Sequence, residues 1–260
     1  MNNKSERILI GDIGNTNTKI CLIDQKSYKI KKVITFNSKK ILSYKFLKDK
    51  IKVKNLYKFA LFSSVVPKYR IALHRILKLK YKVKLFEIKD KKIKKIIKIN
   101  INKKKQIGSD RIANAVGAYK KYKSNCIVLD FGTATTFDVI TKNGIYNGGI
   151  IAPGVNLSLK SLVQSADQLH PFTLRRQKKV IGKNTLDALR SGFYWGYSGL
   201  INNIILKIEK ETGKKYRIIF TGGYAYLFKT SIIKSFNVDR NITIKGIIEI
   251  FKNNKESLHK

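Results

Sequence analysis

The sequence is poor in the residues that build disulfide-rich and metal-centred proteins. It contains two cysteines, Cys21 and Cys126, each inside an apolar run typical of a strand, and three scattered histidines, His74, His170 and His259. We interpret the cysteines as buried free thiols, with a disulfide as the less favoured alternative. No cluster of Cys and His has the spacing of a zinc site. The dispersed histidines also argue against a catalytic triad built on histidine.

Long apolar runs are missing as well. No run of the sequence reaches the roughly 18–20 residues that a membrane-spanning helix needs. Residues 1–7 lack the apolar stretch and the small-residue cleavage site of a signal peptide and lead directly into a run typical of a strand. The sequence therefore predicts a cytoplasmic protein with no membrane partner.

Acidic residues are scarce, and this leaves a large positive charge. The chain has 16 Asp and Glu against 55 Lys and Arg, a formal net charge of +39. Such a charge by itself suggests nucleic acid. However, 46 of the basic residues are Lys and only nine are Arg, the residue favoured for reading bases and clamping phosphates. No nucleic-acid-binding motif accompanies the charge, so we expect no specific nucleic-acid partner and only weak, salt-sensitive binding.

What the chain does contain is enough apolar sequence for a sizeable core. Of its 260 residues 43% are hydrophobic, which is typical of a globular protein with one or two compact domains. No linker rich in Pro, Gly or Ser divides it. The patterns predict strands at residues 7–10, 18–24, 32–36, 59–66, 83–88, 126–129, 135–141, 144–151 and 217–220. They predict helices at residues 39–50, 68–79, from 110 onward, 155–169 and 184–211, the last capped by Gly213.

Two segments are harder to interpret. Residues 89–105 form a basic run, which we interpret as a solvated face of a strand or helix, with the lining of an anionic site as the alternative. After Gly223 we expect a short helix, a strand around Ile242–Ile244 and a final helix. Strand meanders followed by strand–helix units, twice over, are typical of the α/β, duplicated actin/hexokinase/Hsp70-like (ribonuclease H-like) fold. We therefore predict two similar halves, residues 1–115 and 116–260, each with a mixed sheet flanked by helices.

Two acidic, glycine-containing turns carry the strongest functional signal. Asp12-Ile13-Gly14-Asn15-Thr16 and Asp130-Phe131-Gly132-Thr133 each follow a β-branched run and precede another strand. Glycine in a tight turn lets backbone N–H groups approach phosphate oxygens, and an aspartate can hold a cation. Ordinary hairpin turns use the same residues, so either turn alone leaves that alternative open. Together they favour a fold that binds a nucleotide between its halves.

A lysine and a second acidic motif extend this interpretation. Strand alternation after the first turn can return Lys19 to the phosphate side, where it would neutralise phosphate charge. Gly108-Ser109-Asp110-Arg111 stands at the start of an expected helix. Asp110 there could be a helix cap and Arg111 a member of a surface ion pair. In the functional alternative, Asp110 accepts a proton from a substrate hydroxyl and Arg111 holds an anionic group.

Four motifs stand in an order and at a spacing that resemble the type III pantothenate kinase family. They are Asp12-x-Gly14-Asn15-Thr16-x-x-Lys19, Gly108-x-Asp110-Arg111, Asp130-x-Gly132-Thr133-Ala134-x-Thr136 and Gly148-Gly149-Ile150-x-x-Pro153-Gly154. The resemblance covers nearly the whole chain. It implies ATP-dependent phosphorylation of pantothenate to 4′-phosphopantothenate, the first step toward coenzyme A, in an active site between the two halves.

The resemblance also implies cofactors, partners and residue roles. The family uses magnesium with ATP, requires a potassium or ammonium ion, and is homodimeric with its active site near the dimer interface. Asp110 would be the general base, and Asp130 would bind the monovalent cation. The substrate would contact Gly108, Ser109, Asp110, Arg111 and Thr185. The phosphates of ATP would contact Asp12, Ile13, Gly14, Asn15, Thr16, Asn17, Thr18, Lys19 and Thr133.

One departure and two competing hypotheses remain at this level. By spacing, Ile101 and Lys103-Lys104 stand where the family usually has a Tyr and an Asn-Pro pair, which alters the expected wall of the substrate pocket. A different small-molecule or sugar kinase of the same fold would share the phosphate loops. A regulatory accessory factor or a nucleic-acid-binding protein on this fold would fit the positive charge but has no need of Asp12, Asp110 and Asp130 together.

Overall fold

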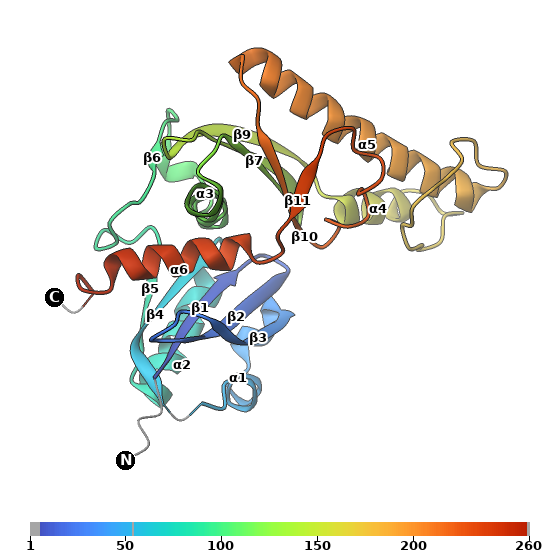
Figure 1. Cartoon of the computed structure of the whole chain (residues 1–260). Coiled ribbons are helices and arrows are strands. Elements are labelled where there is room, and N and C mark those ends of the chain that lie inside the picture. Colours follow the sequence, from blue (N-terminus) through green and yellow to red (C-terminus); the bar gives the residue numbers. More distant parts are fainter. Residues whose placement is uncertain (1–5, 54, 259–260) are drawn as a thin grey trace. The chain divides into compact units, whose positions relative to one another are not determined.

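The computed structural model describes residues 6–53 and 55–258, and its contacts divide the chain into two compact units (Figure 1). Unit 1 consists of residues 1–121 and 241–260, and unit 2 of residues 122–240. The contacts thus join the last helix to the first half of the chain, whereas the sequence patterns grouped it with the second half. The predictions for residues 1–5 and for His259 lie outside the described residues.

Unit 1 is built on a mixed sheet with the strand order β3-β2-β1-β4-β5. Its strands β1 and β2 form an antiparallel hairpin to which β3 adds a third antiparallel strand, while β4 and β5 continue from β1 in parallel. This is a meander followed by strand–helix units, as the sequence patterns predicted. The strands are β1 (Arg7–Ile13), β2 (Asn17–Asp24), β3 (Ile30–Asn37), β4 (Leu56–Ser64) and β5 (Lys84–Glu87).

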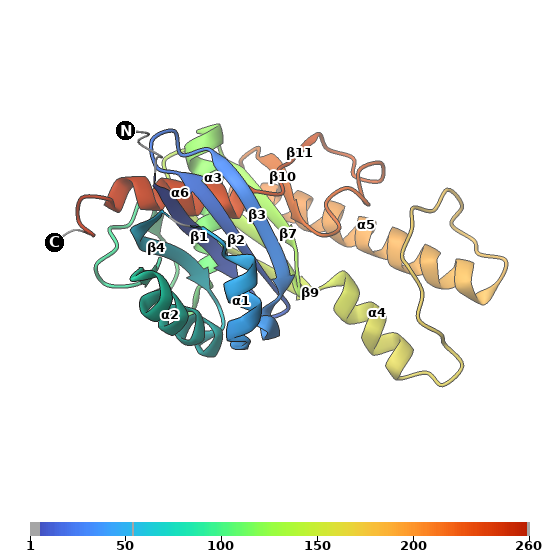
Figure 2. The ribbon, with the colours of Figure 1, turned by 90° about the horizontal axis from the view of Figure 1, so that it is seen from below.

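Helices cover both faces of this sheet, as Figure 2 shows from below. The helices α1 (Tyr44–Lys50) and α2 (Pro67–Tyr81) lie on one face, and α6 (Ile242–Asn254) packs against β1 and β4 on the other. Pro67 occupies the first turn of α2, where its missing N–H costs nothing. The helix expected over residues 39–50 is split, because Ser43 ends a 3₁₀ turn and its hydroxyl then caps α1.

The basic run after β5 is mostly turn. It contains only the two-residue strand β6 (Lys98–Ile99) and is followed by a 3₁₀ turn at Lys104–Gln106 and the helix α3 (Ser109–Tyr122). Ile93, Ile97 and Ile99 are buried, whereas most of its lysines are exposed. The expected strand or helix face is therefore absent over most of the run.

Unit 2 repeats the sheet of unit 1. The strand order β9-β8-β7-β10-β11 corresponds strand for strand to β3-β2-β1-β4-β5, with the same antiparallel and parallel pairings. This repetition confirms the predicted duplicated α/β fold. The strands are β7 (Cys126–Phe131), β8 (Ala134–Ile140), β9 (Ile145–Pro153), β10 (Arg217–Gly222) and β11 (Phe236–Val238).

Two helices of unit 2 pack on its sheet, α4 (Val155–Gln164) and α5 (Thr185–Thr212). The Asn184 side chain accepts a hydrogen bond from the Asp187 N–H at 2.8 Å and so fixes the start of α5. Gly213 ends it in the left-handed conformation, with φ of 63°, as its position after the last helical residue predicted.

Two predictions near the C-terminus are wrong. Residues 223–231 form turns rather than a short helix, and Ile242–Ile244 begin α6 rather than forming a strand. The strand lies earlier, at Phe236–Val238. The alternating Ile242-Thr243-Ile244 resembles a strand locally, but Ile244, Ile247 and Phe251 are fully buried at helical spacing. Burial of this helix face outweighs the strand preference of its β-branched residues.

Both cysteines are free and buried, which confirms their interpretation as thiols. Burial raises the pKa of the Cys21 thiol to about 11, an effect that the charge of Lys19 opposes. In the part of the chain that the structure describes, no helix is long and apolar enough to cross a membrane. No group of three or more His, Cys, Asp or Glu side chains converges within residues 6–53 and 55–258.

Candidate active site

The first predicted phosphate loop connects β1 to β2 in unit 1. Asp12 lies near the end of β1 and pairs directly with Lys19 of β2. The two side chains therefore project from the same face of the hairpin. The turn is tight, since the Gly14 N–H donates to the Asn17 carbonyl at 3.1 Å. Asn15, Thr16 and Asn17 are exposed at its tip. The loop therefore presents backbone groups, with a carboxylate and an ammonium group at its base.

Ser38 braces this loop from the end of β3. Its hydroxyl donates to the Gly14 carbonyl at 2.6 Å and lies 2.9 Å from the hydroxyl of the fully buried Thr18. Its N–H donates to the Thr16 carbonyl at 2.8 Å. Ile13 is equally buried, in the apolar core. Ile13 and Thr18 can therefore contact a nucleotide only through their backbone groups. Their buried side chains support the loop.

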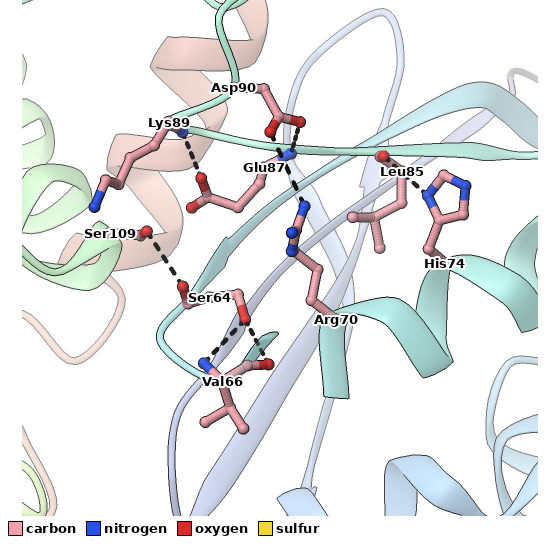
Figure 3. Close-up of polar contacts among 9 residues, drawn as sticks. All are labelled: Ser64, Val66, Arg70, His74, Leu85, Glu87, Lys89, Asp90 and Ser109. Atoms are coloured by element: carbon pink, nitrogen blue, oxygen red, sulfur yellow. Dashed lines mark hydrogen bonds and ion pairs between the residues drawn. The ribbon is translucent and has the colours of Figure 1, made fainter. Parts of the chain in front are cut away.

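The end of β4 connects the first loop to the Gly108–Arg111 motif within unit 1. Ser63 and Ser64 pair in register with Asp12 and Ile13, respectively. The Ser109 hydroxyl donates to the Ser64 carbonyl at 3.3 Å, as drawn in Figure 3. The sheet thus places the start of α3 beside the strand that neighbours the phosphate loop.

Asp110 lies inside the first turn of α3, which begins at Ser109. Its carboxylate accepts a hydrogen bond from the Arg111 N–H at 2.8 Å. Burial raises the pKa of the Asp110 carboxyl, and this outweighs the opposing effects of that hydrogen bond and of the Arg111 and Lys89 charges. A carboxylate with a raised pKa is a better proton acceptor than an ordinary surface aspartate. The start of α3 thus places a carboxylate with a raised pKa next to a guanidinium group.

The second predicted loop connects β7 to β8 in unit 2. Asp130 lies opposite Thr136 across the hairpin and beside Thr221 of β10. The Gly132 N–H donates to the Ala134 carbonyl at 3.1 Å, and Thr133 is exposed. Asp130 thus occupies the position in this sheet that Asp12 occupies in unit 1.

Two glycines from other motifs close around the second loop. A β-carbon on Gly222 would come within 2.6 Å of the Phe131 backbone and 2.7 Å of an Asp130 carboxylate oxygen. A β-carbon on Gly154 would overlap the Thr133 carbonyl. These close approaches explain why glycine is required after Thr221 and after Pro153. The Phe131 carbonyl and an Asp130 carboxylate oxygen therefore both lie close to Gly222.

This donor set suits a monovalent cation. A single carboxylate with neighbouring backbone oxygens offers hard oxygen ligands and little negative charge, and no cysteine or histidine takes part among the described residues. Such a site fits potassium or ammonium better than a transition metal. The fit involves Asp130 together with the carbonyls near Gly132.

Thr185 lies at the exposed start of α5, where Asn184 caps the helix. It lines a groove of about 580 Å³ that also includes Pro153, the neighbour of Gly154. Because Gly154 touches Thr133, the predicted residues Thr133 and Thr185 belong to one continuous region of unit 2. The predicted site residues therefore fall into two groups, Asp12–Lys19 with Gly108–Arg111 in unit 1, and Asp130 with Thr133 and Thr185 in unit 2.

Two sheets that share the order of five strands, each with an acidic loop at the end of its first strand, define the actin/hexokinase-like fold. A Campylobacter jejuni protein solved under the name of a Baf family transcriptional activator aligns with a TM-score of 0.63, covering 95% of this chain and 99% of that one at 22% identity. A structure named as an N-acetylglucosamine kinase from Porphyromonas gingivalis aligns with a TM-score of 0.50 at 13% identity, over 95% and 99% of the two chains. At these identities the similarity concerns the fold.

Sequence similarity narrows the class to one family. The sequence profile of type III pantothenate kinases matches residues 8–207. A type III pantothenate kinase from Pelagibacter ubique (strain HTCC1062) is 49% identical over 244 residues, which cover 93% of this chain and 97% of that protein. This chain belongs to the type III pantothenate kinase family. It is thus a kinase that uses ATP with a divalent metal, and the regulatory and nucleic-acid-binding alternatives are not favoured.

Sequence reasoning missed the residues that hold these loops in place. Ser38 braces the first loop from the next hairpin along the chain, and Lys89 contacts the backbone that leads into α3. Neither stands inside a motif. Gly222 likewise stands in none of the four motifs, and only its contact with Phe131 and Asp130 shows what it does.

Proposed function

We propose that this chain transfers the γ-phosphoryl group of ATP to the primary hydroxyl of pantothenate, with Asp110 as the general base. The observation that carries the proposal is the Asp110–Arg111 pair at the start of α3, a partly buried carboxylate with a raised pKa next to a guanidinium group. This pair lies in the same unit as the loop from Asp12 to Lys19. Phosphoryl transfer needs little more than such positioning and charge neutralisation.

The acceptor is held and activated by the Gly108–Arg111 motif. The Arg111 guanidinium can bind the carboxylate of pantothenate with two parallel hydrogen bonds. Asp110 accepts the proton of the primary hydroxyl as its oxygen attacks the γ-phosphorus. One oxygen–phosphorus bond forms, and the bond from the γ-phosphorus to the β–γ bridging oxygen breaks. The products are 4′-phosphopantothenate and ADP, and the proton leaves on Asp110 until it passes to solvent.

The proposal assigns the loop of unit 1, Asp12–Lys19, to the phosphates of ATP. The backbone N–H groups of residues 13–18 and the Lys19 ammonium neutralise β- and γ-phosphate charge. Thr133 contributes the exposed hydroxyl of the second loop. Magnesium bound with ATP would neutralise part of the phosphate charge. Asp130 would hold a potassium or ammonium ion, which would add positive charge beside the second loop.

The proposal also includes a homodimer formed through α5. The groove beside Thr185 is lined by residues that carry no charge, all in the described part of the chain, although the molecule as a whole has a net charge of +39. An uncharged apolar groove of this kind is typical of an interface. The predicted cytoplasmic location belongs to this proposal too, since ATP is the phosphate donor.

The direct test measures ADP release with ATP and magnesium, with and without pantothenate. We expect release that depends on pantothenate and is several-fold faster in potassium than in sodium buffer. A panel of sugars and other small alcohols as acceptors tests the competing kinase hypothesis. Release that follows a sugar and ignores pantothenate would refute the proposed substrate.

Asp110→Asn tests the base. Because general bases contribute roughly 10²–10⁴-fold to rate, turnover should fall by about that factor, with little change in the KM for ATP. Asp49→Asn, which changes an exposed carboxylate of the same unit, should leave turnover as in the unmodified chain. Near-normal turnover in folded Asp110→Asn would show that another group accepts the proton.

A further inference from the structure

Lys89 is distinguished from the other lysines by what its ammonium group contacts. It follows β5, and its Nζ donates to the Ile107 carbonyl at 2.8 Å and to the Lys105 carbonyl at 3.0 Å. Both carbonyls belong to the short segment that leads into α3. Lys89 is exposed overall, but its ammonium group ties two separate segments of unit 1 together.

The same strand end holds Ser109, the first residue of α3. The buried Glu87 carboxylate accepts the Lys89 N–H at 2.7 Å (Figure 3). Burial raises the pKa of the Glu87 carboxyl and nearby Asp90 adds to this, while the neighbouring Ser109, the hydrogen bond from the Lys89 N–H and the Lys89 charge oppose it. Glu87 and Lys89 therefore contact the segment on both sides of Gly108.

The charges that act on Asp110 come from two elements. Arg111 lies beside it on α3, and Lys89 acts on it from the end of β5. Both positive charges lower the pKa of the Asp110 carboxyl against the larger effect of burial, which raises it. Arg111 is also the proposed ligand of the substrate carboxylate. When the substrate carboxylate neutralises the charge of Arg111, Lys89 is the positive charge that continues to act on the Asp110 carboxyl.

We propose that Lys89 is a positioning residue for the phosphoryl transfer, fixing the backbone that carries Asp110 and holding a positive charge beside its carboxylate. This inference rests on the proposed role of Asp110 as the base. Its two hydrogen bonds to carbonyls determine where α3 begins, and its charge favours the ionised carboxylate. Only the ionised carboxylate can take the proton of the hydroxyl. Lys89 acts through Asp110 and has no need to touch the substrate.

Lys89→Met removes the charge and both hydrogen bonds but keeps most of the aliphatic stem. We expect kcat on its pH plateau to fall about 10- to 100-fold, as is typical when a catalytic group moves by roughly 1 Å. The acidic limb of the kcat profile should move to higher pH, because Asp110 then holds its proton more tightly. Lys89→Arg, which keeps charge and donors, should restore the position of that limb.

The matched control is Lys92→Met, which removes an equal charge from an exposed side chain three residues further along the same segment. It should leave both the plateau and the acidic limb unchanged. Melting curves of all variants separate loss of fold from loss of rate. A limb that stays in place in Lys89→Met, or moves equally in Lys92→Met, would overturn the proposal.

NMR can measure the effect of Lys89 on the pKa of Asp110 without an activity assay. The full chain is labelled with carbon-13 aspartate, and the Asp110 carboxyl is titrated directly. Asp110→Asn identifies the resonance by its loss. We expect the Asp110 resonance of Lys89→Met to titrate at higher pH than in the unmodified chain, and an unchanged titration would overturn the inference. A shifted titration together with normal turnover in Asp110→Asn would overturn the proposed base instead, and with it this role of Lys89 in the reaction.

Discussion

Asp12 and Asp130 occupy equivalent positions in the two sheets but face different residues across their hairpins. Asp12 lies opposite Lys19, whereas Asp130 lies opposite the uncharged Thr136. The first loop therefore carries its own cation, and the second does not have a lysine at the corresponding place. We propose that a monovalent ion at Asp130 supplies positive charge at the second loop.

This difference predicts the behaviour of Asp130→Asn. The substitution keeps the size of the side chain but removes the negative charge that holds a cation. We expect kcat measured with potassium to fall to the value measured with sodium, so that the response to potassium disappears. The readout is initial rate against potassium concentration at constant ionic strength.

Asp167→Asn is the matched control, because it changes an exposed carboxylate of the same unit. It should keep the full potassium response. If Asp130→Asn is still stimulated by potassium to the normal extent, the cation binds elsewhere in the molecule.

At the residue scale, the sequence predicts the groups that stand in local motifs and misses those that come from a distance. The turn at Asp12 and the start of α3 follow from glycine and aspartate in short segments, so their conformations are predictable. Ser38 lies 24 residues from Gly14, which its hydroxyl contacts, and Lys89 lies 18 residues from Ile107. Such pairings depend on sheet register, which a single sequence does not specify.

At the scale of elements, the crossing of α3 and α6 in unit 1 depends on two glycines. A β-carbon on Gly246 would overlap the Ala113 carbonyl, and one on Gly117 would overlap the Ile242 carbonyl. The two helices therefore touch through their backbones. The Thr243 hydroxyl donates to the Asn114 amide oxygen at 2.7 Å across the same contact. Since α3 carries Asp110, this crossing helps to fix the proposed base.

Gly246→Ala should therefore destabilise the protein although alanine favours helices. Overpacking typically costs about 1–3 kcal/mol, which exceeds the gain of roughly 1 kcal/mol from helix propensity. Urea unfolding followed by circular dichroism measures the change. Displacement of α3 should also lower turnover in the folded fraction.

The exposed Asn253 provides a control on the same helix. Asn253→Ala should change the free energy of unfolding by only about 0.5 kcal/mol or less. Equal stability of Gly246→Ala and the unmodified chain would mean that the helices can separate at no cost, and the close crossing would then not support Asp110.

The same crossing explains why the last helix was misread. Its β-branched Ile242-Thr243-Ile244 has a local preference for a strand, and only the return of α6 to unit 1 buries those residues on a helical face. Helices with strong local signals, such as α5 with its Asn184 and Gly213 caps, were predicted almost to the residue. Tertiary contacts determine the helical structure at the start of α6, whereas local capping residues determine the bounds of α5.

At the scale of the whole molecule, the sequence predicts the duplication because the two halves repeat their order of elements. The sequence does not predict which part of the folded surface is free of charged side chains. With 55 basic residues spread along the chain, the uncharged groove on α5 is an exception that appears only when the helix is folded. Gly192, Gly196 and Gly199 have open space where a side chain would stand. A smooth helix face of this kind allows close approach of a second helix.

A homodimer through this face predicts the outcome of Gly196→Glu. The new side chain would find open space within the subunit, so the monomer should fold. Two copies meeting through the groove would instead bury two like charges in an apolar contact, which costs several kcal/mol at an interface. Light scattering after gel filtration should therefore report a dimer for the unmodified chain and a monomer of 29.8 kDa for the variant.

Asn143→Glu adds the same charge at an exposed turn of unit 2 and should leave the dimer intact. Because Thr185 lines the same groove, separating the subunits should also raise the KM for pantothenate, while the KM for ATP changes less. A Gly196→Glu protein that remains dimeric would place the interface on another face. A monomeric variant with an unchanged KM for pantothenate would separate the dimer contact from the proposed contact of Thr185 with substrate.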